Sequence, residues 1–371
     1  MSEPDKLSPD NLRPDKPGRI KGRGSRDNPA GRFEVTTHEA VDDGWYQDGE
    51  PAAPPRTQVS EERARHIISS NASPDVPFDT SINTYRGCEH GCAYCYARPS
   101  HAYLNLSPGL DFETRLFAKT NAAEILRKDL SKRGYQCSAI NLGANTDVYQ
   151  PIERRYRITR DVLEVLNACN HPCTIITKNA LIERDIDILS DMAARKLVHI
   201  FISVTSLDNK LSSRLEPRAS APHRRIQTIA VLTAAGIPTS VNVAPVIPAL
   251  TDIWIEAIIE QAAAAGAVSA GYTVVRLPWE LKQLWEDWLE THYPERKQHV
   301  LSVLRNIRGG ELNEPRFGLR MRGEGPFADL IRNRIALACR KHGIRRRANL
   351  ELDTSQFRPP RAASPQADLF G

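Results

Sequence analysis

Three closely spaced cysteines are the residues of this sequence best suited to chemistry. Cys88, Cys92 and Cys95 follow the pattern C-x3-C-x2-C, and the next cysteine lies far downstream. A structural zinc site usually closes four protein ligands in C-x2–4-C pairs, and ordinary iron–sulfur ligation also uses four cysteines. Three thiolates on one loop can instead hold three irons of a [4Fe–4S] cluster and leave the fourth open to a small chelating ligand. Gly87 and Gly91 would let such a loop curl, because glycine accepts positive φ.

The motif, with an aromatic residue before its third cysteine, resembles the radical S-adenosylmethionine (SAM) superfamily. The resemblance implies a [4Fe–4S] cluster on the three cysteines, with the amine and carboxylate of SAM on the fourth iron. It implies reductive cleavage of SAM to a 5′-deoxyadenosyl radical that abstracts hydrogen from a substrate. An electron donor such as flavodoxin or ferredoxin would supply the electron. The alternative is a Cys3His zinc site, with His90 or His101 as the fourth ligand.

The composition is that of an intracellular globular protein. The chain has 371 residues, of which 40% are apolar, enough for a large core. We expect no membrane association, because no apolar run approaches the roughly 20 residues that cross a bilayer. The polar start predicts no secretory signal. Seven cysteines, with three as cluster ligands, suit a reducing cytoplasmic compartment.

Composition divides the chain into five segments. The family resemblance implies that the central one is the radical SAM core, and a helical, basic extension follows it. We predict these bounds: disordered tail 1–30, N-terminal arm 31–77, core 78–280, basic extension 281–347 and mobile tail 348–371.

Within the core, short β-branched runs alternate with amphipathic stretches, which indicates parallel strands joined by helical crossovers. The predicted strands are Thr80–Tyr85, Ser138–Leu142, Thr174–Thr177, Val198–Val204, Thr239–Ala244 and Tyr272–Arg276. The predicted helices are 119–132, 159–169, 181–195, 221–235 and 252–265. The fold class is α/β, and the family resemblance implies a partial (β/α)6 barrel of the TIM type. The cysteines then follow the first strand directly.

Polar residues follow the ends of the later strands, where β/α barrels carry their active sites. Each one alone could be a helix cap or a loop residue. Four features match one branch of the superfamily: the Tyr94-Cys95-Tyr96 triplet, the Thr146-Asp147 pair, Thr177-Lys178, and Ser203 with Glu216-Pro217 downstream. The sequence is accordingly similar to the spore-photolyase-like branch over about residues 80–280. That resemblance implies hydrogen-atom transfer by Tyr94 and Tyr96 and a SAM carboxylate contact from Lys178. The cofactor-binding residues that it implies are Tyr94, Asn145, Thr146, Asp147, Lys178, Ser203 and Arg218.

One departure from that branch affects the chemistry. The branch has a hydrogen-donating cysteine directly before its Thr/Ser-Asp pair, and this sequence has Ala144 there. Repair of a thymine lesion by that route is therefore in doubt. The resemblance therefore implies that this chain generates the radical as that branch does, but it does not imply the same substrate.

The C-terminal extension predicts a polyanionic partner. Residues 301–347 hold twelve Lys or Arg against four Asp or Glu, whereas the whole chain has a net charge of +5. Arginine suits phosphate contact, so we expect DNA or RNA to bind this region. The alternatives are a solvated helix surface with ion pairs, and a nucleic-acid-binding protein whose cluster does not turn over SAM.

Overall fold

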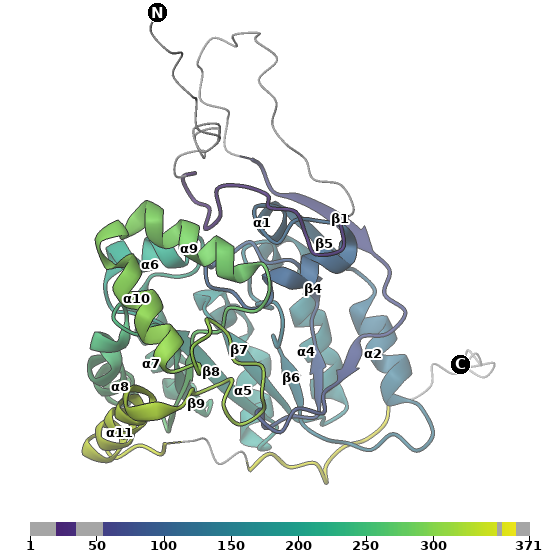
Figure 1. Cartoon of the computed structure of the whole chain (residues 1–371). Helices are drawn as coiled ribbons and strands as arrows, with labels where there is room; N and C mark the ends of the chain where they lie inside the picture. The colour runs from purple at the N-terminus through teal and green to yellow at the C-terminus, as the bar shows by residue number, and fades with distance from the viewer. Residues whose placement is uncertain (1–19, 35–54, 347–350, 361–371) are drawn as a thin grey trace, which may run out of the picture.

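A seven-stranded sheet forms the centre of the computed structural model, which describes residues 20–34, 55–346 and 351–360 (Figure 1). Its strands stand in the order β10-β9-β8-β7-β6-β3-β2. The six strands from β3 to β10 are parallel and neighbour one another in chain order, whereas β2 pairs antiparallel to β3. The bounds are β2 Ile68–Ser70, β3 Thr80–Ile82, β6 Ile140–Leu142, β7 Cys173–Thr177, β8 Val198–Val204, β9 Thr239–Val246 and β10 Ala270–Val274. All six predicted parallel strands are present.

Helices join the parallel strands and cover the outer face of the sheet (Figure 1). Each predicted helical stretch contains a helix whose apolar residues, such as Leu126, Leu163 and Ile229, are fully buried. The crossover helices are α2 Ala122–Leu130, α4 Ile158–Ala168, α5 Ile186–Ala194, α7 Pro222–Ala234 and α8 Ile255–Ala264. Shorter elements are α3 Glu153–Tyr156, α6 Asn209–Leu215 and the 3-10 helices Ala180–Asp185 and Asp252–Trp254. The α/β architecture predicted from the alternating pattern is confirmed.

The first predicted strand differs from the expectation. The run Thr80–Tyr85 splits into β3 and a separate strand β4 (Tyr85–Arg86). Between them, the Asn83 side chain accepts hydrogen bonds from the backbone N–H groups of Asn145 and Thr146. The chain therefore leaves the large sheet at Asn83, and β4 joins a small sheet of order β1-β5-β4.

The small sheet carries the cysteine loop above the large one. It consists of β1 (Gln58–Glu62), β5 (Arg115–Lys119) and β4. Between β4 and β5 lie the cysteines, a 3-10 helix (Arg98–Leu104) and α1 (Asp111–Thr114). The loop is thus held at both ends by strands of the same sheet.

Two ends of the described chain pack on this body. Residues 20–34 run across the cysteine loop, where the backbone N–H groups of Gly24 and Ser25 donate to the buried Glu113 carboxylate. The C-terminal part forms α9 Leu281–His292, α10 Pro294–Asn306 and α11 Gly325–Lys341. Of the predicted tail 1–30, residues 1–19 lie outside the described residues, and of the predicted tail 348–371, residues 348–350 and 361–371 do. The described part of the second tail packs on the body, where the backbone N–H groups of Asp353 and Arg358 donate to the carbonyl oxygens of Lys196 and Cys169. Among the described helices, none is long and apolar enough to span a membrane.

Candidate functional site

The three cysteines of the motif lie on one tightly curled loop. All are free thiols; Cys88 and Cys92 are buried and Cys95 is half-buried. Gly87 and Gly91 have φ values of +72° and +65°. A Cβ on Gly87 would lie 2.6 Å from the Leu116 side chain, and a Cβ on Gly91 would lie 2.5 Å from the Glu113 carboxylate. Both glycines are therefore needed for the curl of the loop and for its close packing.

Burial dominates the electrostatics of the thiols. It raises the pKa of Cys88, Cys92 and Cys95, and for Cys88 the Asp147 carboxylate and the other two sulfurs raise it further. The Lys178 ammonium opposes the effect of burial on the pKa of Cys92. Because metals bind thiolates, a bound cation must offset this cost. The three thiols do not each have a protein cation beside them. Together they are a donor set suited to a cationic metal centre.

The two histidines near the motif have other partners, although Nδ1 of His101 is buried without one. Both ring nitrogens of His90 have partners, namely the Asp147 carboxylate at 3.3 Å and the Asn179 amide at 3.1 Å. His101 Nε2 lies 3.0 Å from the carbonyl oxygen of Arg115. Among the described residues, no three His, Cys, Asp or Glu side chains converge to hold a single metal ion.

The cysteine loop faces a cavity of about 590 Å³. The cavity lies beside the carboxyl ends of the parallel strands, where β/α barrels place their active sites. Ten of the predicted site residues line it: Cys88, Cys92, Cys95, Tyr94, Tyr96, Asn145, Thr146, Asp147, Lys178 and Ser203. Arg218 is not among the lining residues, because its guanidinium pairs with Glu89 at 2.8 Å beside the loop.

The loop after β6 approaches the loop after β7 very closely. Gly143 has φ +91°, and a Cβ there would lie 2.7 Å from the carbonyl oxygen of Ile176. The Lys178 side chain then enters the cavity with its Nζ 5.9 Å from the centroid of the Tyr94 ring. No carboxylate of the described residues forms an ion pair with this ammonium. A cationic group thus stands free beside the three thiols.

Comparison with known proteins identifies this arrangement. Residues 82–262 match the family model of the radical SAM superfamily. This region is a radical SAM domain. An uncharacterized protein of Mycobacterium tuberculosis is 36% identical over 222 residues, which are 59% of this chain and 65% of that protein. An uncharacterized protein of Methanocaldococcus jannaschii is 25% identical over 240 residues, covering 65% of this chain and 85% of its own length.

Solved structures share the fold. Spore photoproduct lyase complexed with dinucleoside spore photoproduct has a TM-score of 0.56 and 15% identity. The match covers 77% of this chain and 81% of that chain. At this identity the likeness shows the fold alone. The radical SAM domain is therefore built on the same scaffold as that lyase.

Tyr94 of the radical SAM domain is held by a buried polar group. Its hydroxyl donates to Glu216, and Thr205 donates to the same carboxylate oxygen at 2.8 Å. Arg225, which is 1% exposed, pairs with the other oxygen. Burial raises the pKa of Tyr94, and the Glu216 charge raises it further. Burial alone would raise the pKa of Glu216, but Arg225 and Lys178 lower it below its ordinary value. The sequence gives no signal for Arg225, because an arginine in an amphipathic helical stretch is typical of an exposed position.

Tyr96 stands in a different environment. Its side chain is 48% exposed and lines the cavity, and its hydroxyl donates to the carbonyl oxygen of Ala144. The guanidinium of Arg276 lies 5.6 Å from the ring centroid. Desolvation raises the pKa of Tyr96 to about 12. The phenol is therefore neutral at physiological pH and open to the cavity.

Asp147 ties three loops together. Its carboxylate accepts hydrogen bonds from the Thr177 hydroxyl at 2.7 Å and the Lys178 backbone N–H at 2.8 Å, and it pairs with His90. Burial would raise its pKa, but His90 and these hydrogen bonds lower it to about 2. Asn145 and Thr146 are held from below by Asn83. Because these contacts engage its carboxylate oxygens, Asp147 holds in place the loops that form the site.

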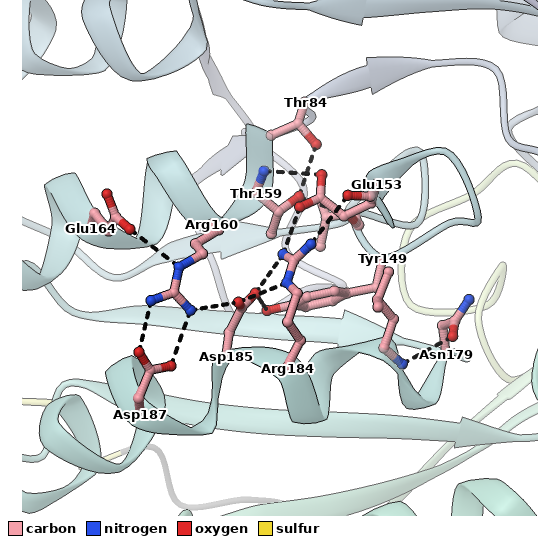
Figure 2. Close-up of polar contacts among 12 residues, drawn as sticks. Thr84, Tyr149, Glu153, Thr159, Arg160, Glu164, Asn179, Arg184, Asp185 and Asp187 are labelled. Atoms are coloured by element: carbon pink, nitrogen blue, oxygen red, sulfur yellow. Dashed lines mark hydrogen bonds and ion pairs between the residues drawn. The ribbon is translucent and has the colours of Figure 1, made fainter. Parts of the chain in front are cut away.

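An ion-pair network supports these loops from outside the cavity (Figure 2). Arg184 bridges Glu153 at 2.8 Å and Asp185 at 2.7 Å. The Tyr149 hydroxyl donates to Asp185 at 3.0 Å, and the Tyr85 hydroxyl donates to Glu153. Both carboxylates are fully buried. The network thereby connects the strand before the cysteines to the loop after β6.

The predicted basic surface is only partly available to a partner. Arg308 is 2% exposed and donates to four backbone carbonyl groups, including those of Val274 and Val275. Four more arginines of this region form ion pairs, which are Arg316–Glu314, Arg320–Asp75, Arg332–Asp329 and Arg334–Glu256. Arg305, Arg340, Arg345 and Arg346 are exposed. Arg347 lies outside the described residues.

Proposed function

We propose that the protein is a radical SAM enzyme that abstracts hydrogen from a nucleic-acid substrate. The observation that carries the proposal is the convergence of Cys88, Cys92 and Cys95 on one cavity at the carboxyl ends of six parallel strands. The aligned region spans 65% of the length of its mycobacterial relatives. Activity, substrate and partners are accordingly our proposal for this chain.

The residues present fit both cofactors. Cys88, Cys92 and Cys95 would hold a [4Fe–4S] cluster, and Lys178 would meet the carboxylate of SAM in a charge-assisted contact. Thr146 and Ser203 are the proposed hydrogen-bonding partners of SAM. When bound and supplied with one electron, this pair of cofactors provides a 5′-deoxyadenosyl radical. A small protein such as flavodoxin or ferredoxin is the proposed electron donor, and the cytoplasm is the proposed compartment.

Tyr96 is our proposed hydrogen-atom donor in place of the cysteine replaced by Ala144. Both hydroxyls donate to a protein oxygen, and what favours Tyr96 over Tyr94 is its exposure, which is 48% against 6%. Homolysis of the phenol O–H bond would return hydrogen to a product radical and leave a neutral tyrosyl radical, which one electron and one proton restore. Freeze-quenched wild-type samples should show a tyrosyl signal that Tyr94→Phe keeps and Tyr96→Phe loses. An equal tyrosyl signal in Tyr96→Phe would show that Tyr96 is not the hydrogen-atom donor.

A nucleic-acid substrate is supported by the basic C-terminal extension and by the shared scaffold. Spore photoproduct lyase has been solved with a dinucleoside lesion. The second candidate is a cluster-containing nucleic-acid-binding protein that does not turn over SAM. It is favoured by the exposed arginines, which would serve binding alone.

SAM cleavage separates these candidates. The protein is reconstituted anaerobically with iron and sulfide, reduced with dithionite and incubated with SAM. We expect 5′-deoxyadenosine from the wild type and none from Cys92→Ala, whereas Cys339→Ala should behave as the wild type. Nucleic-acid binding without 5′-deoxyadenosine, from protein with a full cluster, would favour the second candidate and refute the first.

A further inference from the structure

Arg276 is a cavity-lining arginine with few protein partners. It lies two residues after β10, and its Nη1 is 3.8 Å from the sulfur of Met321. Its Nε is buried without a hydrogen-bond partner, and its guanidinium faces the Tyr96 ring. No carboxylate of the described residues forms an ion pair with it. A desolvated charge is costly without a counter-charge, so an anion that binds beside Arg276 would stabilise its guanidinium.

The neighbouring arginines have more protein partners than Arg276, although Nε of Arg308 is also buried without one. Arg320, which also lines the cavity, pairs with Asp75, and Arg308 donates to backbone carbonyls. Both add positive charge near Arg276. The Arg320 charge lowers the pKa of Arg276, and the Arg276 charge lowers the pKa of Arg308. This wall of the cavity therefore carries an excess of positive charge that an incoming anion would relieve.

We propose that Arg276 binds a phosphodiester group of the nucleic-acid substrate. This inference rests on the proposed function and names the contact that holds the substrate in the cavity. A guanidinium offers a planar fork that fits two phosphate oxygens. SAM has its own cation in Lys178, at the end of β7. Three strand spacings separate β7 from β10, or roughly 14 Å along the sheet.

Exposed aromatic rings beside the cavity point to a nucleotide rather than a small carboxylate. Trp279, three residues after Arg276, is 62% exposed, and Tyr103 and Phe33 are 69% and 49% exposed. The Arg32 guanidinium lies 4.4–5.1 Å from the centroids of these rings, and Glu280 pairs with it. The patch is thus aromatic and electrically balanced. Such a surface stacks bases of a single strand.

The patch is continuous with the cavity on two sides. Tyr103 and Ser100 lie on one face of the 3-10 helix Arg98–Leu104, because this helix repeats every three residues. The Ser100 hydroxyl accepts a hydrogen bond from Asn145, which lines the cavity. On the other side, Trp279 follows Arg276 on the same connection. A strand held at Arg276 can therefore place an adjoining base on the aromatic patch.

The test measures anisotropy of a fluorescein-labelled ten-residue oligothymidylate bound to the cluster-loaded protein with SAM. Arg276→Gln should weaken binding ten- to a hundredfold, the loss of a charged hydrogen-bonding pair. Arg276→Lys should lie between this variant and the wild type. Trp279→Ala should weaken binding about five- to a hundredfold, because one base loses its stacking partner. Arg133→Gln removes an exposed arginine of the same charge outside the basic extension and the cavity, and should change affinity less than threefold.

A methylphosphonate oligothymidylate, which lacks backbone charge, should bind wild type and Arg276→Gln equally weakly. The inference is overturned if Arg276→Gln, with a full cluster, binds the charged oligonucleotide as the wild type does. It is also overturned if the wild type does not bind it, or if the variant loses as much affinity for SAM as for the oligonucleotide. Production of 5′-deoxyadenosine by the wild type decides the proposed function separately.

Discussion

Each of the three proposed cluster ligands is a thiol whose pKa burial raises, so iron would have to displace a proton from every sulfur. Cluster assembly should therefore become more favourable as pH rises. The remaining four cysteines do not line the cavity, and His171 of the Cys169–Cys173 segment is bonded to the Tyr135 hydroxyl at 2.8 Å. Their surroundings are those of packed side chains rather than ligands.

Single alanine substitutions test the ligand set. Cys88→Ala, Cys92→Ala and Cys95→Ala should each lose bound iron and the brown absorbance, because a cube held by two thiolates has no third anchor on this loop. Cys137→Ala and Cys339→Ala are the matched controls and should keep both. Iron analysis and visible spectra after anaerobic reconstitution give the answer. Loss of iron from a control variant that remains folded would contradict the three-ligand assignment.

Lys178→Ala should weaken SAM binding and leave the cluster in place. Loss of a charge-assisted contact costs roughly 1.5–3 kcal/mol, which is ten- to a hundredfold in affinity. Equilibrium dialysis with labelled SAM measures the effect. Lys341→Ala, an exposed lysine on α11, is the control. An unchanged dissociation constant in Lys178→Ala would place the SAM carboxylate elsewhere.

At the scale of elements, the loops after β6 and β7 and the cysteine loop act as one unit around Asp147. The sequence predicts the parallel strands because strands covered on both faces are continuous apolar runs, as in Val198–Val204. It also predicts which loops carry polar residues. It does not predict Asn83 or the small sheet, because their partners lie far along the chain. It also misses Arg225, because an arginine in a helical stretch is typical of an exposed position. The family resemblance implies a cofactor contact for Arg218, whereas its guanidinium pairs with Glu89 and does not line the cavity.

The Asp147 carboxylate should make the stability of this unit depend on pH. Its pKa falls from 3.8 to about 2 on folding, so it stabilises the protein above pH 4 by roughly 2 kcal/mol. That contribution is lost as pH falls from 4 toward 2. Urea unfolding of the cofactor-free protein should show Asp147→Asn destabilised at pH 7, with a smaller difference from the wild type at pH 3. The same difference at both pH values would exclude this linkage.

At the scale of the whole molecule, a contact between distant segments bridges the two edges of the open sheet. Asp75, in the connection from β2 to β3, accepts from the Gly318 backbone N–H at 2.7 Å and pairs with Arg320. Next to them, the carbonyl oxygen of Met321 accepts from the N–H of Val274, the last residue of β10. Since β2 and β10 are the edge strands, this contact closes the side of the cavity.

Asp75→Ala should loosen this closure. Arg320 would lose its carboxylate partner, and the Asp75 side chain is only 6% exposed, so the contact is shielded from water. Hydrogen exchange should speed up in residues 71–79 and 316–323 and stay unchanged in α4, which packs elsewhere. Asp329→Ala breaks an exposed pair with Arg332 and is the control. Unchanged exchange in both segments would mean that the contact does not hold the edges together.

The paramagnetic resonance spectrum of the dithionite-reduced protein, recorded with and without SAM, tests most directly whether the three-cysteine loop leaves an iron open to SAM. We expect a [4Fe–4S]⁺ signal in the wild type that changes shape when SAM is added. The reason is that the amine and carboxylate of SAM bind the iron that has no cysteine ligand. An identical spectrum in the presence of SAM, at concentrations where dialysis shows it bound, would contradict a radical SAM site in this cavity.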